Sequence, residues 1–185
     1  IKKLDAGFRW DRDENKKFPF RGKDIKIPTL REVFEEFPAM KINIELKTSE
    51  NSNAKSLCDL INEFKRTDKS IVASGFGNTL TEFRAICPNV ATSASFSEST
   101  WFLAMYQLGL AKNYETKMQA LQIPPRIFDS EVVTEDFVEA VRERNLQIHV
   151  WTINREEDMR RLLKTDVDGI MTDYPDRLLK VIGNK

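Results

Sequence analysis

The chain has 185 residues, enough for one domain with a substantial core, and its 41% apolar and 31% charged residues are ordinary for a globular protein. Lysine plus arginine and aspartate plus glutamate number 29 each, so the net charge is zero, which argues against a broad basic surface for nucleic acid. The longest apolar run, residues 101–105, is too short to span a bilayer and no signal peptide is visible, so the default expectation is a cytoplasmic protein without a transmembrane segment.

The first predicted helix begins after Thr29. Thr29 and Glu32 fit a capping box, in which the hydroxyl and the carboxylate each accept a hydrogen bond from a free backbone N–H. Apolar residues then follow with helical spacing until Pro38 ends the run: Leu30, Val33, Phe34 and Phe37. An amphipathic helix is therefore expected here.

The next segment, residues 41–47, alternates apolar and polar residues as a strand does. Asn43, Glu45 and Lys47 share one face, opposite the apolar one. In a parallel barrel, the inward face at the carboxyl end of a strand lies in the mouth of the active site. A carboxylate and an ammonium group there have the chemistry to hold a metal ion and a phosphate, although a salt bridge on an ordinary strand is the alternative.

Five further strands follow, and each of the six strands is followed by a helix, at intervals of about 20–30 residues. The strands are expected at residues 71–73, 89–96, 118–123, 148–153 and 167–172. The helices are expected around residues 57–64, 80–86 and 98–111, after Thr134 and Asn154 as capping residues, and around residues 178–182.

Repeated strand–helix units imply a parallel sheet, either open and doubly wound or closed as a (β/α)₈ barrel. No strand is followed by a GxGxxG or Walker motif, so a nucleotide-binding fold lacks its signature. The predicted strands end in polar residues, and barrels collect functional groups at such ends: Lys47, Ser74, Ser95, Asn154 and Asp173.

Cysteine and histidine are too rare for a disulfide framework or a zinc site. The chain has two cysteines, Cys58 and Cys87, no CxxC motif and one histidine. The cysteines are therefore expected to be reduced or core thiols.

Several segments in order resemble the glycerophosphodiester phosphodiesterase family. They are the stretches at residues 4–7, 18–22, 27–33, 43–47 (Asn-Ile-Glu-Leu-Lys), 150–154 (Val-Trp-Thr-Ile-Asn) and 168–175 (Asp-Gly-Ile-Met-Thr-Asp-Tyr-Pro). The resemblance implies a TIM-type (β/α)₈ barrel that is incomplete here, with strands three to eight present and the first two βα units missing. Residues 1–185 would form a single domain in which residues 1–27 belong to the family's insertion loop. The chain begins at Ile1, and we expect its start to be missing.

The same resemblance implies metal-dependent hydrolysis of glycerophosphodiesters to an alcohol and glycerol phosphate, with Mg²⁺ or Ca²⁺ as the cofactor. Related enzymes act on lysophospholipids, so a lysophospholipase D-type activity is an alternative on the same scaffold. Carried over to this sequence, Glu45 would be a metal ligand and Lys47 a phosphate contact, while Trp151 would line the substrate pocket.

The family's two acid/base histidines have no counterpart in this chain, because His149 matches neither of them. Phosphodiester cleavage needs a base for the nucleophile and an acid for the leaving alkoxide. Ser74 and Ser95 have no paired base in the sequence, so a serine nucleophile is not expected. No catalytic residue is assigned within the chain, and we expect little activity from the chain alone.

Four other features have both a structural and a site interpretation. His149 shares a strand face with Trp151 and is either a structural residue, which we favour, or pocket lining. Asp173 and Glu98 either belong to helix starts, which we favour, or face the mouth. The apolar helix 98–111 is either core, which we favour, or a contact for a lipid-like substrate.

A non-catalytic reading stays open beside the enzyme. Two absent strands would leave exposed sheet edges, which invite pairing with another chain. The chain would then be a phosphate-binding remnant or an oligomerising interaction module, closed by a homodimer or a domain swap.

Overall fold

The computed structural model describes residues 1–11, 17–48, 52–127 and 129–183. The chain divides into two compact units, Ile1–Met40 and Lys41–Lys185. That residues 1–185 form one domain, with an insertion loop up to residue 27, stays a prediction.

The first unit contains helix α1 (Leu30–Glu36), and the predicted capping box is present. The backbone N–H of Glu32 donates to the Thr29 hydroxyl, and the Thr29 N–H donates to the Glu32 carboxylate at 2.7 Å. Hydrogen bonds from Lys2 and from Thr29 lower the pKa of Glu32 to about 2. The predicted helix start is therefore confirmed.

The polar loop before α1 is organised by one carboxylate. The Asp5 side chain accepts hydrogen bonds from the backbone N–H groups of Gly7 at 2.9 Å and Gly22 at 2.8 Å, which draws two distant parts of the loop together. The Arg21 guanidinium lies over the rings of Phe8 and Phe18, 4.4 and 4.2 Å from their centroids. Charge–aromatic stacking and backbone capping therefore organise a segment with few buried side chains.

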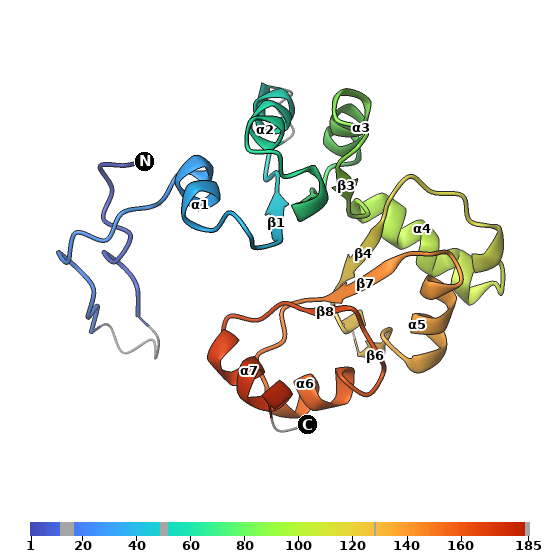
Figure 1. The fold of residues 1–185 in the computed structure, drawn as a ribbon. Helices are drawn as coiled ribbons and strands as arrows, with labels where there is room; N and C mark the ends of the chain where they lie inside the picture. The colour runs from blue at the N-terminus through green and yellow to red at the C-terminus, as the bar shows by residue number, and fades with distance from the viewer. Residues whose placement is uncertain (12–16, 49–51, 128, 184–185) are drawn as a thin grey trace. The chain divides into compact units, whose positions relative to one another are not determined.

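The second unit is built on parallel strands that alternate with helices, as the sequence predicts (Figure 1). The strands are β1 (Ile42–Glu45), β2 (Ser70–Ala73), β3 (Ala91–Thr92), β4 (Ala120–Ile123), β7 (Gln147–Val150) and β8 (Gly169–Ile170). They pair in the orders β1-β2-β3 and β4-β7-β8, and a parallel bridge between Ser93 and Ala120 joins the two groups. The spatial order of these strands therefore follows the chain order.

The inner face of this sheet is concave, because side chains of non-neighbouring strands meet across it. The amide of Gln122 on β4 donates to the Asn43 side chain on β1 at 3.1 Å, although β2 and β3 lie between these strands in the sheet. The Asn43 amide also lies 3.9 Å from the Met171 sulfur, just beyond β8. Within the described ranges β1 pairs only with β2 and β8 only with β7, so the sheet curves without closing into a barrel.

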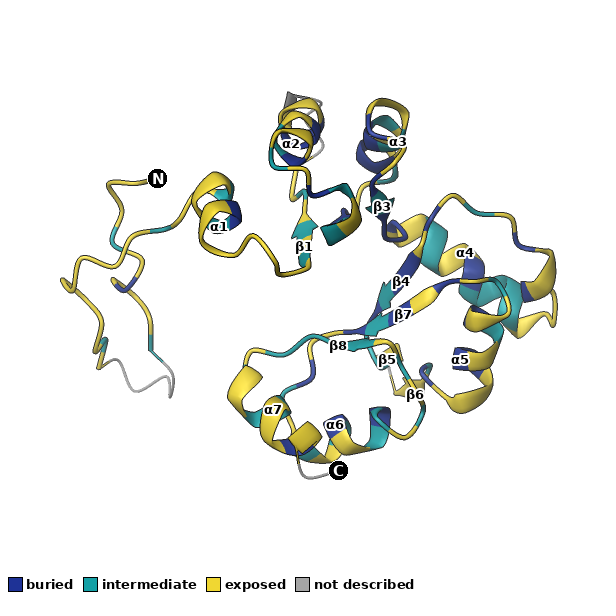
Figure 2. Ribbon diagram, viewed as in Figure 1, coloured by how far each residue is buried: buried dark blue, intermediate teal, exposed yellow. Residues whose placement is uncertain are grey.

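Helices cover the outer face of the sheet. They are α2 (Ser52–Glu63), α3 (Gly77–Ile86), α4 (Phe96–Gln107), α5 (Glu135–Arg142), α6 (Glu156–Leu162) and α7 (Pro175–Gly183). The main hydrophobic cluster lies between these helices and strands β4 and β7, and its fully buried members include Phe102, Phe137, Ile148 and Met159. Figure 2 shows buried residues in α2, α3 and β3 as well, whereas β1 alternates between half-buried and exposed residues.

Helix α4 is only partly core. Phe102 is buried, as predicted for the apolar helix 98–111, but Phe96 and Trp101 are 78% and 62% exposed. Within the part of the chain that the structure describes, neither this helix nor any other is long and apolar enough to cross a membrane.

The cysteine prediction is wrong. Cys58 on α2 and Cys87 at the end of α3 form a disulfide, with their Cα atoms 5.8 Å apart. The two positions are separated by 29 residues in sequence and meet only because α2 and α3 pack side by side. The expected cytoplasmic location stays a prediction, and the disulfide counts against it, because disulfides persist mainly in oxidising compartments.

Two local predictions also need correction. Asn154 does not cap α6, whose N-cap is Arg155 without a side-chain hydrogen bond. A short antiparallel hairpin, β5 (Arg126–Ile127) and β6 (Ser130–Glu131), follows the Pro124-Pro125 pair where only a break was expected. Strands of two residues carry too little alternation to be recognised in the sequence.

Candidate functional site at the carboxyl ends of the strands

Glu45 and Lys47 lie at the carboxyl end of β1, as predicted. They form an ion pair of 2.6 Å, and their side chains are 43% and 76% exposed. Glu45 shares the face of Asn43, which the contact with Gln122 identifies as the concave one. Glu45 and Lys47 therefore form the salt bridge that was the alternative prediction. The pair lies at the mouth of the concave face, where solvent and a ligand have access to both groups.

Trp151 directly follows β7, and its backbone N–H donates to the Ile123 carbonyl at 3.1 Å, which continues the strand pairing. Alternation along the strand places its side chain on the same face as His149. The ring is 42% exposed, so it is not a buried core residue. No hydrogen bond joins Trp151 to Glu45 or Lys47 within the described residues.

A chain of hydrogen-bonded polar side chains crosses the concave face, two residues before Glu45 on β1 and two residues before Trp151 on β7. The Gln122 amide nitrogen donates to the Asn43 side-chain oxygen at 3.1 Å and lies 3.2 Å from Nδ1 of His149. Asn43 precedes Glu45 by two residues, and His149 precedes Trp151 by two. The chain of side chains therefore fixes the strands that carry the predicted metal ligand and the predicted substrate contact.

Sequence reasoning missed Gln122. The signal in the sequence was a polar residue between Leu121 and Ile123 in an otherwise apolar strand. A polar side chain that is partly removed from water needs a hydrogen-bond partner. His149 was favoured as a structural residue. It occupies a half-buried position on the inner face, two residues before Trp151, and its Nδ1 atom is within hydrogen-bond distance of Gln122.

Burial of the His149 imidazole lowers its pKa, and the nearby Asp168 carboxylate opposes this shift. The ring lies against Gly169 of β8, where an added Cβ atom would be 2.9 Å from the ring carbon Cδ2. Glycine at this position therefore makes room for the imidazole.

Ser74, Ser95 and Glu98 serve the fold. The Ser74 hydroxyl donates to the Leu46 carbonyl at 2.8 Å. Ser95 and Glu98 form a capping box at the start of α4, which confirms the predicted helix-start role of Glu98. The Glu98 carboxylate also pairs with Arg84 of α3 at 2.6 Å. Partial burial alone would raise the pKa of Glu98, but hydrogen bonds from Arg84 and Ser95 outweigh it, so the pKa is lowered.

Asp173 and Asn154 meet beyond the carboxyl ends of β7 and β8. The Asn154 amide donates to the Asp173 carboxylate at 2.9 Å, and its side-chain oxygen accepts from the backbone N–H of Asp173 at 3.0 Å. These bonds tie the segment after β7 to the segment after β8. Asn154 therefore holds a turn in place of the helix cap expected for it.

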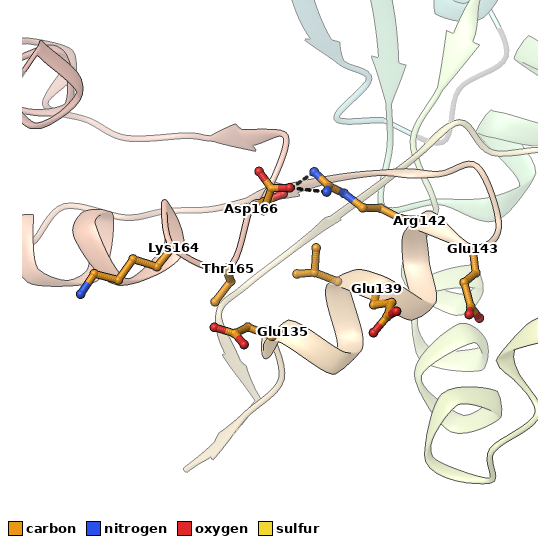
Figure 3. A pocket seen from close by; sticks show the side chains of 8 residues that line it. Glu135, Glu139, Arg142, Glu143, Lys164, Thr165 and Asp166 are labelled. Atoms are coloured by element: carbon orange, nitrogen blue, oxygen red, sulfur yellow. Dashed lines mark hydrogen bonds and ion pairs between the residues drawn. The ribbon is translucent and has the colours of Figure 1, made fainter. Parts of the chain in front are cut away.

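A groove of about 320 Å³ lies away from the carboxyl ends of the strands, between α5 and the segment before β8 (Figure 3). Glu135, Glu139 and Glu143 line it on the α5 side, and Arg142 pairs with Asp166 across it. None of the predicted site residues contributes to this groove.

The residues of the mouth do not form a complete metal site. Among the described residues, no three His, Cys, Asp or Glu side chains come together in a way that could hold a metal ion. Glu45 alone gives a hard cation one carboxylate, whereas Mg²⁺ and Ca²⁺ take six or more oxygen ligands.

The chain is similar to known proteins over most of its length. The model of the Glycerophosphoryl diester phosphodiesterase family matches residues 1–177. A glycerophosphodiester phosphodiesterase of Caldanaerobacter subterraneus is 29% identical over 189 residues, covering 98% of this chain and 69% of its own length. The mouse lysophospholipase D GDPD1 is 27% identical over an alignment of 188 residues that covers 88% of this chain and 59% of that protein.

Solved structures share the fold. A glycerophosphoryl diester phosphodiesterase domain of Mycobacterium tuberculosis superposes with a TM-score of 0.80 at 15% identity, covering 100% of this chain and 74% of that one. An Oleispira antarctica phosphodiesterase, solved with the product sn-glycerol-3-phosphate, gives a TM-score of 0.71 at 22% identity, with 99% and 69% covered. Since the family model spans nearly all of its residues, the chain belongs to the glycerophosphoryl diester phosphodiesterase family.

Proposed function

We propose that the protein of which this chain is a part hydrolyses glycerophosphodiesters to an alcohol and glycerol phosphate. Membership of the family and similarity to a bacterial glycerophosphodiester phosphodiesterase support the reaction class. The observation that carries the site is the exposed Glu45–Lys47 pair at the carboxyl end of β1, on the concave face of a parallel sheet.

In this proposal Lys47 leaves its ion pair with Glu45 and binds a phosphoryl oxygen of the substrate. A long, exposed lysine side chain makes this exchange at little cost, because an exposed ion pair contributes only about 0–1 kcal/mol. The ammonium group then offsets negative charge that develops on the phosphoryl group. Trp151 offers an exposed aromatic face against which the glycerol or alcohol part of the substrate packs.

Glu45 is proposed as one ligand of the Mg²⁺ or Ca²⁺ ion implied by the family resemblance, the remaining ligands coming from the substrate, water or residues outside this set. The described residues do not complete such a site by themselves. We also propose that the six parallel strands correspond to strands three to eight of a (β/α)₈ barrel.

The acid and base of the reaction have no assigned residue in this chain, so the 185-residue chain alone is expected to show negligible turnover. A turnover assay with glycerophosphocholine and Mg²⁺ or Ca²⁺ checks this. Robust turnover by the chain, lost in the Glu45→Gln variant, would refute the proposal that the acid/base half of the site is missing. In a longer protein that contains the chain, Glu45→Gln should reduce turnover at least about tenfold, which corresponds to ~1.4 kcal/mol of transition-state stabilisation.

The substrate has a second candidate class. The similarity to the mouse lysophospholipase D favours a lysophospholipid, and the exposed Phe96 and Trp101 offer apolar surface for an acyl chain. Comparing turnover of glycerophosphocholine and lysophosphatidylcholine by the longer protein separates the two classes.

The alternative to an enzymatic function is a non-catalytic role. The open edges of β1 and β8 favour it, since unpaired strand edges accept another chain. A phosphate-binding or oligomerising module would bind glycerol 3-phosphate or form dimers in the absence of any turnover by the longer protein.

A further inference from the structure

The hydrogen bond between Gln122 and His149 determines where the imidazole proton lies. The Gln122 amide nitrogen is 3.2 Å from Nδ1 of His149 and 3.1 Å from the Asn43 side-chain oxygen. An amide nitrogen donates hydrogen bonds and accepts none, so with the Gln122 amide oriented as it is in the structure, with its nitrogen toward the ring, Nδ1 accepts and is unprotonated. The neutral ring then carries its proton on Nε2.

The surroundings of the ring maintain this state. The half-buried position lowers the pKa of His149, and a proton on Nδ1 would face the N–H of the Gln122 amide. Asp168 is the charged group that favours the protonated ring, but its carboxylate already accepts a hydrogen bond from the Ile148 backbone N–H at 2.9 Å. The contact with Gly169 restricts the ring further.

The Nε2 atom has no hydrogen-bond partner among the described residues, although the ring lies on the concave face below Trp151. Nε2 is not among the buried side-chain atoms that lack a partner, so water can reach it, and a ligand oxygen can take the place of that water. An oxygen-rich ligand at the mouth would supply such an acceptor.

We infer that His149 is a ligand-contact residue of this site: Gln122 holds its ring as the neutral Nε2–H tautomer, and Nε2–H donates a hydrogen bond to an oxygen of a bound phosphate ester. The ligand class rests on the proposed function, whereas the tautomer rests only on the geometry. His149 positions the ligand in this inference and transfers no proton.

The chain has a single histidine, so its imidazole nitrogens give unambiguous NMR signals. In the ¹⁵N-histidine-labelled 185-residue chain at pH 8, we expect Nδ1 to have the chemical shift of an unprotonated nitrogen and Nε2 that of a protonated one. Gln122→Leu should give a mixture of tautomers. Gln122→Glu should move the proton to Nδ1 and raise the pKa of the ring, because a carboxylate accepts from Nδ1 and favours the charged form.

Gln147→Leu is the matched control. Gln147 is an exposed glutamine on β7, the strand of His149, and its side chain has no partner among the described residues. The substitution should leave the histidine signals unchanged. A wild-type ring protonated on Nδ1, or a tautomer ratio that does not change in either Gln122 variant, would overturn the inference. Far-ultraviolet circular dichroism establishes that each variant is folded, and the glutamate variant keeps the test open if the leucine variant does not fold.

Titration with glycerol 3-phosphate tests the contact itself. Saturation should shift the Nε2 resonance, and Gln122→Leu should weaken binding measured by calorimetry about three- to tenfold, as expected for one hydrogen bond. If calorimetry detects binding and the histidine resonances do not move, the inference is wrong and the proposed function stands. If glycerol 3-phosphate does not bind to the chain or to a longer protein containing it, both are wrong.

Discussion

Glu45 at the end of β1 and Glu98 in the first turn of α4 are both carboxylates that follow the strand pattern of the sequence, but their surroundings give them different roles. Glu98 is half-buried and bonded to Arg84, Ser95 and its own helix start, so it is committed to the fold. Glu45 has one exposed partner, Lys47, which a ligand can replace. The number of partners and the degree of burial distinguish a structural carboxylate from a candidate site residue.

Glu98→Gln should lower the free energy of unfolding by about 1–3 kcal/mol at neutral pH, because it removes the charge-assisted bonds to Arg84 and Ser95. The folded pKa of Glu98 lies below its ordinary value of 4.5, so the contribution is present above that pH and is lost as the pH falls through the folded pKa. Urea unfolding of both proteins at pH 7 and pH 3 measures the difference, which should shrink at pH 3.

Glu82→Gln on α3 is the control for this substitution. Glu82 has no ion pair or hydrogen bond from its side chain within the described ranges, so the loss should be below about 0.5 kcal/mol. An equal loss in both variants would contradict the role assigned to Glu98.

Gly169→Ala should destabilise the protein by about 1–3 kcal/mol, because the added methyl group would meet the His149 ring at 2.9 Å. The single-histidine NMR spectrum should change in parallel, since the ring must move. Gly75→Ala is the matched control, as nothing lies within 4 Å of an added Cβ atom there. Thermal unfolding measures the melting temperatures of the two variants, and equal values would contradict the packing argument.

At the scale of elements, α2 and α3 are joined by the disulfide as well as by packing. A cross-link between positions 29 residues apart stabilises the folded state by about 3–4 kcal/mol in the chain-entropy model, because it restricts the unfolded chain.

Reduction with dithiothreitol should therefore lower the melting temperature by several degrees, at about 2–4 °C per kcal/mol for a chain of this size. The Cys58→Ser, Cys87→Ser double variant should melt at the reduced temperature and should not respond to dithiothreitol. Thiol titration of the protein purified without reductant provides an independent measurement. Two reactive thiols there would show that the cysteines are not paired in solution.

At the scale of the whole molecule, the open sheet edges are the dominant feature of the second unit. The described residues leave β1 and β8 each with one paired neighbour, and an unpaired edge is a template for another strand. We expect the 185-residue chain to dimerise or form larger species as its concentration rises from micromolar to millimolar. Sedimentation velocity measures this, and a single monomeric species over the whole range would argue against the oligomerising role.

The strand–helix order, the capping box of α1 and the alternation of the strand that begins the residue 41–47 segment follow from local pattern alone. Alternation along a strand and spacing along a helix are encoded by neighbouring residues, which is why these predictions agree with the structure. The family could likewise be recognised from short segments in order, and the match over residues 1–177 confirms it.

Only the tertiary structure decided the pairing of Cys58 with Cys87, the turn held by Asn154 and the contact of Asn43 with Gln122 and His149. Each joins residues far apart in the chain, and the curvature of the sheet and the packing of helices on it determine which of them meet. The sequence shows which residues are polar and which face of a strand they share, but their partners depend on how far the sheet bends.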